Sequence, residues 1–279
     1  MREKKIYLNK NIAIYGMGIT GLSTAKTLKD LGANIFCWDD SKKIREKIKS
    51  HNFYIKKFWL KQNTVDKIVI SPGIDINKCK IKKYLKKNLK KIITDLDLFF
   101  ELKKKSTIIS ITGTNGKSTT CKIIEEVLKA ANYKVCIVGN IGNPILSLSK
   151  IKNNNIFILE ASSYQLQYSK PFRSKYAAIL NISADHLERH KTVKNYIKIK
   201  SKIFLAQNKL DYSYINSDNK YGKYIKKIFK FKKIKSKLIL VNKLSVKNLL
   251  NKVDNKYFKS EGGIENLAFV YKIVKMLKA

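Results

Sequence analysis

The segment Ile111–Thr119 has the residue types and spacing of a phosphate-binding loop. It reads Ile-Thr-Gly-Thr-Asn-Gly-Lys-Ser-Thr, and it joins a run of β-branched residues to a helical pattern. N–H groups at a helix start bind phosphate, Lys117 reaches the β- and γ-phosphates, and the Ser118 hydroxyl binds Mg²⁺. The usual pattern has a glycine five residues before Gly116, where this chain has isoleucine. We therefore interpret the loop as a shortened variant that begins at Gly113.

A second glycine-rich loop, Gly16–Gly21, has the pattern Gly-x-Gly-x-x-Gly between an expected strand and an expected helix. Its glycines allow a close approach of the backbone to a phosphate. Asp39 lies about 20 residues further on, where an acidic side chain binds a ribose hydroxyl. Taken alone, this pattern predicts NAD binding. The alternative is a glycine turn that only packs a helix against a strand.

Further polar residues follow two expected strands in the second half of the chain. Glu160 ends an apolar run, and a carboxylate at the carboxyl end of a parallel strand faces the ligand crevice, where it can hold Mg²⁺. If Glu160 stood alone, a solvated glutamate at the edge of a sheet would be the favoured interpretation. The loop 181–190 contains two of the chain's three histidines together with aspartate, glutamate and arginine, which favours a site.

Alternating apolar runs and helical patterns must position these residues, and they predict an α/β fold with doubly wound parallel sheets. The expected strands are 11–15, 34–38, 67–70, 91–94, 107–112, 134–138, 156–160, 177–182 and 212–216, and the expected helices are 21–31, 117–131 and 193–205. Residues 220–237 are rich in lysine and predict a solvated helix or a mobile loop. We expect a Rossmann-like N-terminal domain, residues 1–100, followed by a P-loop-type ATPase domain, residues 101–279.

The charge of the chain is its most unusual bulk property. Among 279 residues, 59 are Lys or Arg and 20 are Asp or Glu, which gives a formal net charge of +39. Such a charge favours nucleic acid or anionic membranes as partners. However, all but four of the basic residues are lysine, whereas specific nucleic-acid readers use arginine for bidentate contacts with guanine. We therefore attribute the lysines to an A/T-rich coding sequence and expect no specific nucleic-acid partner.

The four cysteines show neither a Cys-x-x-Cys pair nor metal-ligand spacing with the histidines. We therefore expect reduced thiols in a cytoplasmic protein. No apolar run approaches the roughly 20 residues of a membrane span, and we expect no signal peptide before the first strand.

Six segments, in order along the chain, resemble the Mur ligase family. They are Tyr15–Ser23, Ser71–Ile74, Ile111–Thr119, Gly139–Gly142, Leu159–Leu166 and Asn181–His190. The first glycine loop, combined with the last two segments, is similar to the family members that add D-glutamate. The resemblance changes one interpretation, because in this family the first glycine loop holds the UDP part of the substrate rather than a dinucleotide.

The resemblance also implies sets of site residues. The implied ATP-binding residues are Gly113, Thr114, Asn115, Gly116, Lys117, Ser118, Thr119 and Asn266. The implied substrate-binding residues are Ile19, Thr20, Asp39, Asp40, Gly73, Asn140 and His186. The implied metal ligands are Ser118, Glu160, His186 and Lys200, and the implied catalytic residues are Lys117, His186 and Lys200. Lys200 matches the family lysine that becomes carbamylated, a change that turns a cation into a carboxylate-like ligand.

The implied cofactors are ATP and Mg²⁺, and the implied substrates are UDP-N-acetylmuramoyl-L-alanine and D-glutamate, joined during synthesis of peptidoglycan precursors. In the implied reaction the substrate carboxylate attacks the γ-phosphate of ATP and forms an acyl phosphate. The amine of D-glutamate then attacks the carbonyl carbon and displaces phosphate. Charge neutralisation and positioning would supply most of the catalysis.

The chain departs from the family pattern in two places. We expect the family's C-terminal domain to be absent, and a separately encoded domain is then the expected partner. The family segment His-Asn-x-x-Asn aligns with residues 262–266, where two glycines replace the His-Asn pair and Asn266 is kept. Three hypotheses follow: an incomplete or split ligase, a UDP-sugar- and ATP-binding remnant without catalysis, and a basic nucleic-acid-associated protein on this scaffold.

Overall fold

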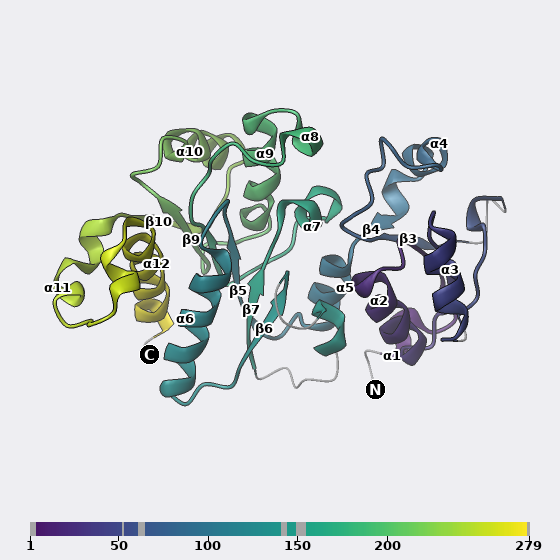
Figure 1. Cartoon of the computed structure of the whole chain (residues 1–279), viewed down its shortest axis with the longest axis horizontal. Helices are drawn as coiled ribbons and strands as arrows, with labels where there is room; N and C mark the ends of the chain where they lie inside the picture. The colour runs from purple at the N-terminus through teal and green to yellow at the C-terminus, as the bar shows by residue number, and fades with distance from the viewer. Residues whose placement is uncertain (1–3, 52, 61–64, 141–143, 149–154, 278–279) are drawn as a thin grey trace. The chain divides into compact units, whose positions relative to one another are not determined.

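The computed structural model of the protein describes residues 4–51, 53–60, 65–140, 144–148 and 155–277. They form two compact units, each with one parallel β-sheet and flanking helices (Figure 1). The first unit consists of residues 1–104 with 143–151 and 167–170, and the second consists of 105–142, 152–166 and 171–279. Two short segments from the second half of the chain therefore belong to the first unit. The assignment of one functional domain to residues 1–100 and another to 101–279 stays a prediction.

The first unit is built on a four-stranded parallel sheet with the order β2-β1-β3-β4. Its strands are β1 (Asn11–Tyr15), β2 (Asn34–Trp38), β3 (Lys67–Ile70) and β4 (Ile92–Ile93). Its helices include α1 (Lys4–Tyr7), α2 (Ile19–Asp30), α3 (Lys42–Lys49), α4 (Lys82–Lys87) and α5 (Asp95–Leu102), with short 3-10 turns η1 (Phe58–Leu60), η2 (Leu89–Lys91) and η3 (Ile145–Leu148). The central strand β1 is buried from Ile12 to Tyr15, as a strand covered on both faces must be.

The second unit is built on a six-stranded parallel sheet with the order β10-β9-β8-β5-β7-β6. Its strands are β5 (Thr107–Thr112), β6 (Val135–Gly139), β7 (Ile156–Glu160), β8 (Tyr176–Ile179), β9 (Tyr212–Asn216) and β10 (Lys237–Val241). Its helices are α6 (Lys117–Ala130), α7 (Ser163–Tyr168, whose last two residues belong to the first unit), α8 (Leu187–His190), α9 (Val193–Lys200), α10 (Gly222–Phe231), α11 (Lys247–Leu250) and α12 (Glu261–Leu277), with 3-10 turns η4 (Ser201–Phe204), η5 (Lys243–Val246) and η6 (Lys256–Lys259).

Strand register brings three chain segments together at one edge of the second sheet. The central strand β5 pairs with β7 so that Ile111 lies opposite Glu160, and with β8 so that Thr112 lies opposite Ile179. Strand β6 pairs with β7 so that Gly139 also lies opposite Glu160. Because all these strands are parallel, the segments that follow them leave the sheet at the same edge, where ligands bind in open α/β sheets.

The predicted α/β fold with parallel sheets is confirmed, and the strands expected at 11–15, 34–38, 67–70, 107–112, 156–160 and 212–216 have those bounds. The strand expected at 177–182 ends at Ile179, because the chain then turns toward the phosphate loop. The expected helix 193–205 is α9 followed by the 3-10 turn η4. The lysine-rich stretch 220–237 contains the helix α10 and the start of the strand β10.

Among the residues that the structure describes, no helix combines the length and the apolar composition of a membrane span.

Candidate active site

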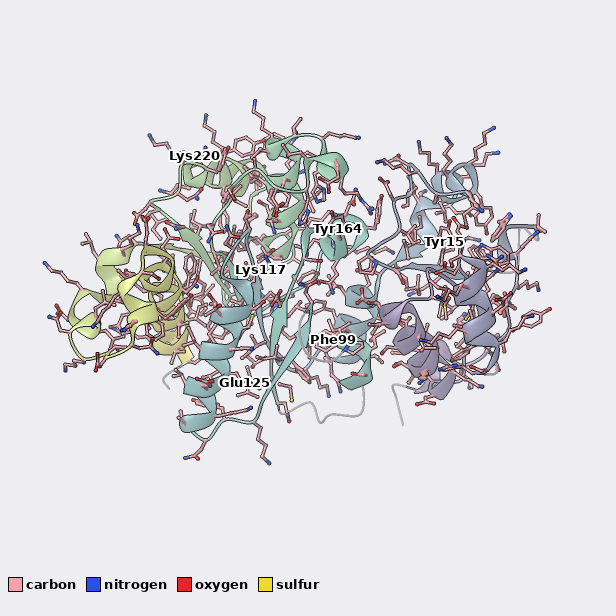
Figure 2. All side chains as sticks on the ribbon, viewed as in Figure 1. Tyr15, Phe99, Lys117, Glu125, Tyr164 and Lys220 are labelled. Carbon is pink, nitrogen blue, oxygen red and sulfur yellow. The ribbon has the colours of Figure 1, made fainter. Side chains whose placement is uncertain are left out.

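The glycine loop of the second unit lies where the sequence predicts it, between β5 and α6 (Figure 1), and Figure 2 labels Lys117, the first residue of α6. Gly116 has a φ of 79°, a left-handed conformation that favours glycine, and α6 begins at the next residue. Thr114 N and Asn115 N donate hydrogen bonds to the backbone oxygen and the side-chain oxygen of Asn181 (3.0 and 2.8 Å). The first N–H groups of α6 have no partner within the helix, which is the general basis of phosphate binding at such a position.

Two lysine side chains meet at one carbonyl oxygen of this loop. Lys117 Nζ donates to Gly113 O (3.0 Å) and Thr114 O (2.6 Å). Lys200 Nζ, from the end of α9, donates to the same Gly113 O (2.8 Å) and to Thr112 Oγ1 (3.2 Å). Lys200 is only 1% exposed and its ammonium group lies 4.6 Å from the centre of the Tyr196 ring. The structure therefore brings together two of the three residues predicted to be catalytic.

The surroundings change the proton affinity of both lysines. Burial, reinforced by the nearby charge of Lys117, lowers the pKa of Lys200 to about 7, against the opposing effect of Asp185 and Glu160. Burial also lowers the pKa of Lys117, and the same two carboxylates oppose the shift. Lys200 is thus a mixture of amine and ammonium near neutral pH, unlike an ordinary surface lysine.

Glu160 is a buried carboxylate whose two oxygens both accept hydrogen bonds. Ser118 Oγ donates to Oε2 (2.8 Å) and Asn140 Nδ2 donates to Oε1 (3.0 Å). Asn140 follows Gly139, whose φ of 110° lets the end of β6 approach Glu160, since a Cβ atom there would lie 2.3 Å from the Glu160 carbonyl oxygen. The side chain of Glu160 is 1% exposed. Through Ser118 it contacts the first turn of α6.

The donor set around Glu160 fits a magnesium ion in part. A carboxylate and a serine hydroxyl at the start of a phosphate-loop helix are hard oxygen donors, which Mg²⁺ prefers, and it commonly completes its shell with water and phosphate. Of the four predicted metal ligands, Ser118 and Glu160 are in direct contact. No group of three or more His, Cys, Asp and Glu side chains suited to a metal occurs within the described ranges.

His186 lies in a separate cluster of polar side chains. Its Nδ1 is 3.2 Å from Tyr164 Oη, and its Nε2 is 3.4 Å from Asp185 Oδ2. Tyr164, labelled in Figure 2, also donates to Glu188 Oε1 (3.0 Å). His186 has a φ of 52°, is the N-cap of α8, and its side chain is 40% exposed. The hydrogen bonds and ion pairs of His186 with other side chains in the described part of the chain are therefore with Tyr164, Asp185 and Glu188, and not with the other three predicted metal ligands.

Asn266 packs directly on the phosphate loop. It is 4% exposed in α12, and a Cβ atom at Gly116 would lie 2.3 Å from its Oδ1. Its Nδ2 donates to the hydroxyl of Tyr257 (2.6 Å). Asn266, which matches the family pattern although its neighbours at 262 and 263 do not, therefore contacts the loop that is predicted to hold ATP. Thr119, the last residue of the predicted set, is half-buried in the first turn of α6.

In the first unit, Asp39 ties the other glycine loop to the next helix. Its Oδ2 accepts a hydrogen bond from Met17 N (2.7 Å) and its Oδ1 accepts one from Ser41 N (2.9 Å). The side chain is 9% exposed. The loop itself is closed tightly, because a Cβ atom at Gly21 would lie 2.0 Å from the Gly16 carbonyl oxygen. Asp39 therefore connects the glycine loop to the start of α3 by hydrogen bonds, whatever ligand the loop binds.

The other residues predicted to bind substrate in this unit lie at the same end of the sheet. Asp40 accepts hydrogen bonds from Tyr15 Oη (2.7 Å) and Trp38 Nε1 (3.3 Å). Ile19 and Thr20 begin α2, and Ile19 is 79% exposed, which is unusual for an isoleucine and leaves it accessible to a ligand. Gly73 follows β3, and a Cβ atom at this position would meet no atom within 4 Å.

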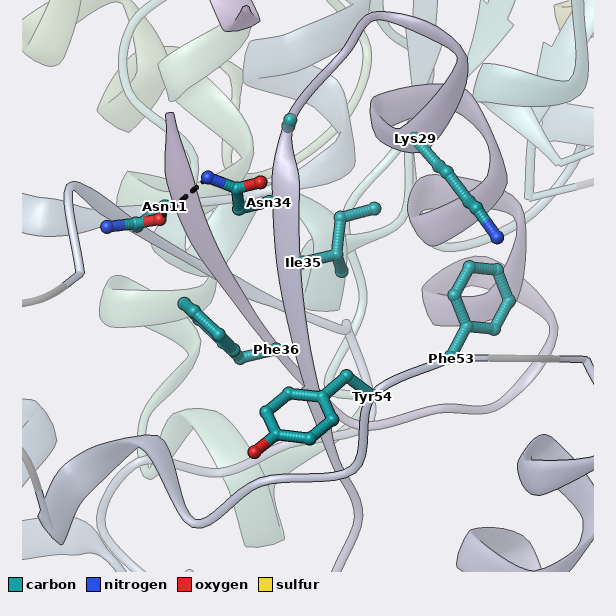
Figure 3. A pocket seen from close by; sticks show the side chains of 8 residues that line it. Asn11, Lys29, Asn34, Ile35, Phe36, Phe53 and Tyr54 are labelled. Carbon is teal, nitrogen blue, oxygen red and sulfur yellow. Dashed lines mark hydrogen bonds between the residues drawn. The ribbon is translucent and has the colours of Figure 1, made fainter. Parts of the chain in front are cut away.

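A cavity of about 400 Å³ lies at the opposite end of the strands in the first unit (Figure 3). Asn11 and Asn34, the first residues of β1 and β2, line it and are joined by a hydrogen bond of 3.2 Å. Its other walls are the side chains of Lys29, Ala33, Ile35, Phe36, Phe53 and Tyr54. None of the residues predicted to bind substrate lines this cavity, so it is distinct from the predicted uridine-diphosphate site.

Three residues contribute to the second site without having been selected from the sequence. Asn181 holds the phosphate loop, Tyr196 lies under the Lys200 ammonium group, and Asp185 is close enough to affect the pKa values of both lysines. Asp185 and Asn181 were visible as members of a polar loop. No sequence signal singles out Tyr196, because its position depends on how α9 packs.

Comparison with known proteins identifies the family of the chain. The model of the Mur ligase middle domain matches residues 111–275, and the model of the MurD-like N-terminal domain of Mur ligases matches residues 10–93. The chain belongs to the Mur ligase family. One segment of the family pattern, Gly139–Gly142, lies partly outside the described residues, because Ile141 and Gly142 are not described.

Several curated Mur ligases are similar to this chain over most of its length. The UDP-N-acetylmuramoylalanine--D-glutamate ligase of Rickettsia bellii (strain RML369-C) is 37% identical over 98% of this chain and 64% of its own length. The enzyme of the same name from Clostridioides difficile (strain 630) is 37% identical over 77% of this chain and 49% of its own length. The chain thus spans between about half and 64% of these relatives.

A solved structure supports the fold alone. The crystal structure of UDP-N-acetylmuramate:L-alanyl-gamma-D-glutamyl-meso-diaminopimelate ligase from Neisseria meningitides superposes with a TM-score of 0.59 at 13% identity. The match covers 97% of this chain and 94% of that chain.

Proposed function

We propose that this Mur ligase chain is an ATP-dependent ligase that joins D-glutamate to UDP-N-acetylmuramoyl-L-alanine in peptidoglycan precursor synthesis. The observation that carries the proposal is the meeting of Lys117 and Lys200 at the Gly113 carbonyl, beside the buried carboxylate of Glu160. A lysine ammonium group and a buried carboxylate that can hold a divalent cation, both at a phosphate loop, suit transfer of a γ-phosphoryl group. The choice of D-glutamate and of the muramoyl substrate rests on the names of the similar ligases.

The proposed reaction has two steps. In the first, an oxygen of the substrate carboxylate attacks the γ-phosphorus of ATP, the bond to the β–γ bridging oxygen breaks, and ADP leaves. In the second, the amine of D-glutamate attacks the carbonyl carbon of the acyl phosphate. An amide bond forms, phosphate leaves with the electrons of the broken C–O bond, and the amine proton is released to solvent.

Lys117 is proposed to neutralise charge on the transferring phosphoryl group. Two of its three ammonium protons are donated to Gly113 O and Thr114 O, which fixes the group over the loop and leaves the third proton for a phosphate oxygen. Because the lysine is held before the reaction begins, little reorganisation is needed when charge develops.

Glu160 and Ser118 are the residues that would hold Mg²⁺. A bound Mg²⁺ supplies charge neutralisation and orientation of the phosphate oxygens. Asn140 would keep Glu160 in position, because its amide donates to the carboxylate oxygen that Ser118 does not use. His186 is then proposed as a substrate contact, since its surroundings are Tyr164, Asp185 and Glu188.

Lys200 is proposed to be carbamylated. With a pKa of about 7, a large fraction is neutral amine at physiological pH, and only the amine can attack CO₂. The new N–C bond forms as one C=O bond electron pair moves to oxygen, and the amine loses one proton. The product carries a negative charge, so the repulsion between Lys200 and Lys117 becomes an attraction.

The first unit is proposed to bind the UDP part of the substrate at the glycine loop Gly16–Gly21, with Ile19, Thr20, Asp40 and Gly73 nearby. The exposed Ile19 and the open space at Gly73 allow a ligand to approach the backbone. Asp39 would act by holding the loop and α3 in register rather than by contact alone.

Phosphate release tests the proposal. The purified chain is incubated with Mg-ATP and UDP-N-acetylmuramoyl-L-alanine, with and without D-glutamate, and phosphate and the amide product are measured together. We expect release that depends on D-glutamate and equals amide formation. Binding of both ATP and the UDP-sugar without turnover would instead support the second hypothesis, a binding remnant. Absence of binding to either ligand would contradict both.

A further inference from the structure

Tyr257 is an aromatic residue placed at the edge of the phosphate loop. It lies in η6, is 39% exposed, and its hydroxyl accepts a hydrogen bond from Asn266 Nδ2 (2.6 Å). Asn266 in turn packs against Gly116, where a Cβ atom would lie within 2.3–2.9 Å of three of its side-chain atoms. Tyr257 is therefore connected to the loop through one buried amide.

The backbone of Tyr257 is clamped to the first turn of α12. Its carbonyl oxygen accepts hydrogen bonds from Ser260 Oγ (2.7 Å) and Ser260 N (3.1 Å), and Gly263 N donates to Ser260 Oγ (3.1 Å). A Cβ atom at Gly263 would lie 2.0 Å from this carbonyl oxygen, so only glycine allows the approach. Gly263, which stands where the family pattern has asparagine, therefore allows the backbone of Tyr257 to pack against the start of α12.

The packing around the loop also indicates on which side the nucleoside end of a bound nucleotide would lie. The reactive groups Lys117, Lys200 and Glu160 gather on the side of β7 and α9. At Gly113 the loop is packed closely, since a Cβ atom would lie 3.1 Å from Leu180 Cβ. Gly116 is packed against Asn266, whereas a Cβ atom at Gly262, in the first turn of α12, would meet nothing within 4 Å, so the open space beside the loop lies at the start of α12.

We propose that Tyr257 is the stacking surface for the purine base of the nucleotide, and that Asn266 positions it. The inference deepens the proposed ATP-dependent function and rests on it. An aromatic ring binds any base through its π-face, so it supplies affinity where residues 262 and 263 offer no side chain for hydrogen bonds. Clamping of the backbone keeps the ordering cost of the ring low on binding.

Two ligands separate base binding from phosphate binding. Mg-ATP carries the base and Mg-tripolyphosphate carries only the phosphates, and the affinity of each is measured by titration calorimetry. Tyr257→Leu should weaken Mg-ATP binding about tenfold, the size expected for loss of one stacked base, and change tripolyphosphate binding by less than about twofold. Tyr257→Phe keeps the ring and should keep most of the ATP affinity.

A matched control removes another exposed ring from the same unit. Phe231→Leu, at the end of α10 where Phe231 is 82% exposed, should leave both affinities unchanged. Equal weakening of both ligands in Tyr257→Leu would overturn the inference, because the ring would then act on the loop alone. Unchanged or tighter ATP binding in Tyr257→Leu would overturn it as well, and so would loss of ATP affinity in Tyr257→Phe equal to that in Tyr257→Leu.

The proposed function fails in a different way. If the unaltered chain bound neither Mg-ATP nor Mg-tripolyphosphate, the phosphate loop itself would be inactive and both proposals would fall. If it bound both ligands and only the tyrosine variants behaved against expectation, the stacking role alone would be wrong. Equal thermal unfolding midpoints of the variants would exclude misfolding as the cause.

Discussion

Lys117 and Lys200 donate hydrogen bonds to the same acceptor, the carbonyl oxygen of Gly113, at 3.0 and 2.8 Å. Two basic side chains from different helices thus converge on one loop atom. The arrangement has a cost, because each ammonium group raises the free energy of the other in a buried environment. Burial, reinforced by the charge of Lys117, lowers the pKa of Lys200 to about 7 and leaves this residue partly neutral beside the phosphate loop.

Removal of the Lys117 side chain should abolish nucleotide binding without affecting the first unit. Ligands that bind only the native state raise stability by about 2.7 kcal/mol at a hundredfold excess over Kd. In Lys117→Ala, Mg-ATP should therefore no longer raise the thermal unfolding midpoint, whereas the UDP-sugar still should. Lys122→Ala, an exposed lysine of the same helix, is the control. Loss of both ligand effects in Lys117→Ala would refute the assignment of separate sites.

The depressed pKa of Lys200 should be visible in the pH dependence of stability. Between pH 7 and about 10.5 the unfolded chain binds a proton at this residue that the folded chain does not, so folding stability rises with pH over this window. Lys200→Met should remove that slope and be relatively more stable near pH 6, by several kcal/mol with about 5 kcal/mol as the upper limit. Urea unfolding at a series of pH values, in buffer free of CO₂ and bicarbonate so that Lys200 stays an unmodified amine, measures this.

The control for Lys200→Met is Lys198→Met, an exposed lysine on the same helix, whose stability profile should follow that of the unaltered chain. Carbamylation adds a second readout, because ¹³C-labelled bicarbonate should give a carbamate signal in the unaltered chain and none in Lys200→Met. An identical pH slope in the two lysine variants would mean that Lys200 is an ordinary ammonium group.

Neutralising Glu160 should remove the magnesium contribution to nucleotide binding. Glu160→Gln keeps a side chain of the same size and an oxygen for one hydrogen bond, but it loses the charge that a divalent cation requires. The ratio of affinities for Mg-ATP and for ATP in EDTA should fall by about 10- to 100-fold. Glu125→Gln, further along α6, serves as the control. A ratio unchanged in Glu160→Gln would show that the metal is held elsewhere.

Asp39 and Asp40 should differ sharply although they are neighbours. Asp39→Ala leaves Met17 N and Ser41 N without their acceptors, which should cost about 1–3 kcal/mol of folding stability and weaken UDP-sugar binding. Asp40→Asn keeps an oxygen for the Tyr15 hydroxyl and should leave stability nearly unchanged. Denaturant unfolding and the UDP-sugar-induced shift are measured for both. Equal destabilisation by the two changes would contradict the structural role of Asp39.

Much of the fold could be predicted because the parallel strands are short apolar runs separated by glycine loops. The run Ile156–Leu159 is buried throughout. Glu160, the residue that follows it, lies at the carboxyl edge of the sheet because of the strand register. The end of β8 was harder, because the polypeptide leaves the sheet at Leu180 to hydrogen-bond the phosphate loop, a tertiary effect that no local pattern records. The lysine-rich helix α10 was equally hidden, since lysine suits both helix and loop.

The candidate site was predictable where a motif fixes its own geometry. Lys117 and Ser118 are placed by one loop and one helix start, and Glu160 by a strand end. Lys200 could not be selected from composition or spacing, because only the packing of α9 distinguishes it from the chain's many other lysines. It was selected through the family resemblance. Tyr196 and Tyr257 were missed for the same reason, since both depend on contacts between distant segments.

His190 should make the fold sensitive to acid. The ring is fully buried, its Nε2 lies 2.9 Å from Ser163 Oγ, and its Nδ1 has no hydrogen-bond partner within the described part of the chain. Burial, with the positive charge of Arg189, lowers its pKa to about 4. Between pH 4 and 6.5 the unfolded chain therefore binds a proton that the folded chain does not. The contribution of neutral His190 to the free energy of unfolding is complete above pH 6.5. It decreases as the pH falls toward 4, by about 3 kcal/mol in all.

His190→Gln tests this, because the amide can still pair with Ser163 but does not titrate. The unfolding free energy of the variant, measured in urea from pH 4 to 7, should have a flatter slope than that of the unaltered chain. His51→Gln, in the first unit, should leave the slope as it is. Should His190→Gln keep the full slope, the acid sensitivity would belong to other groups, and the buried histidine would be only a packing element beneath the loop that carries His186.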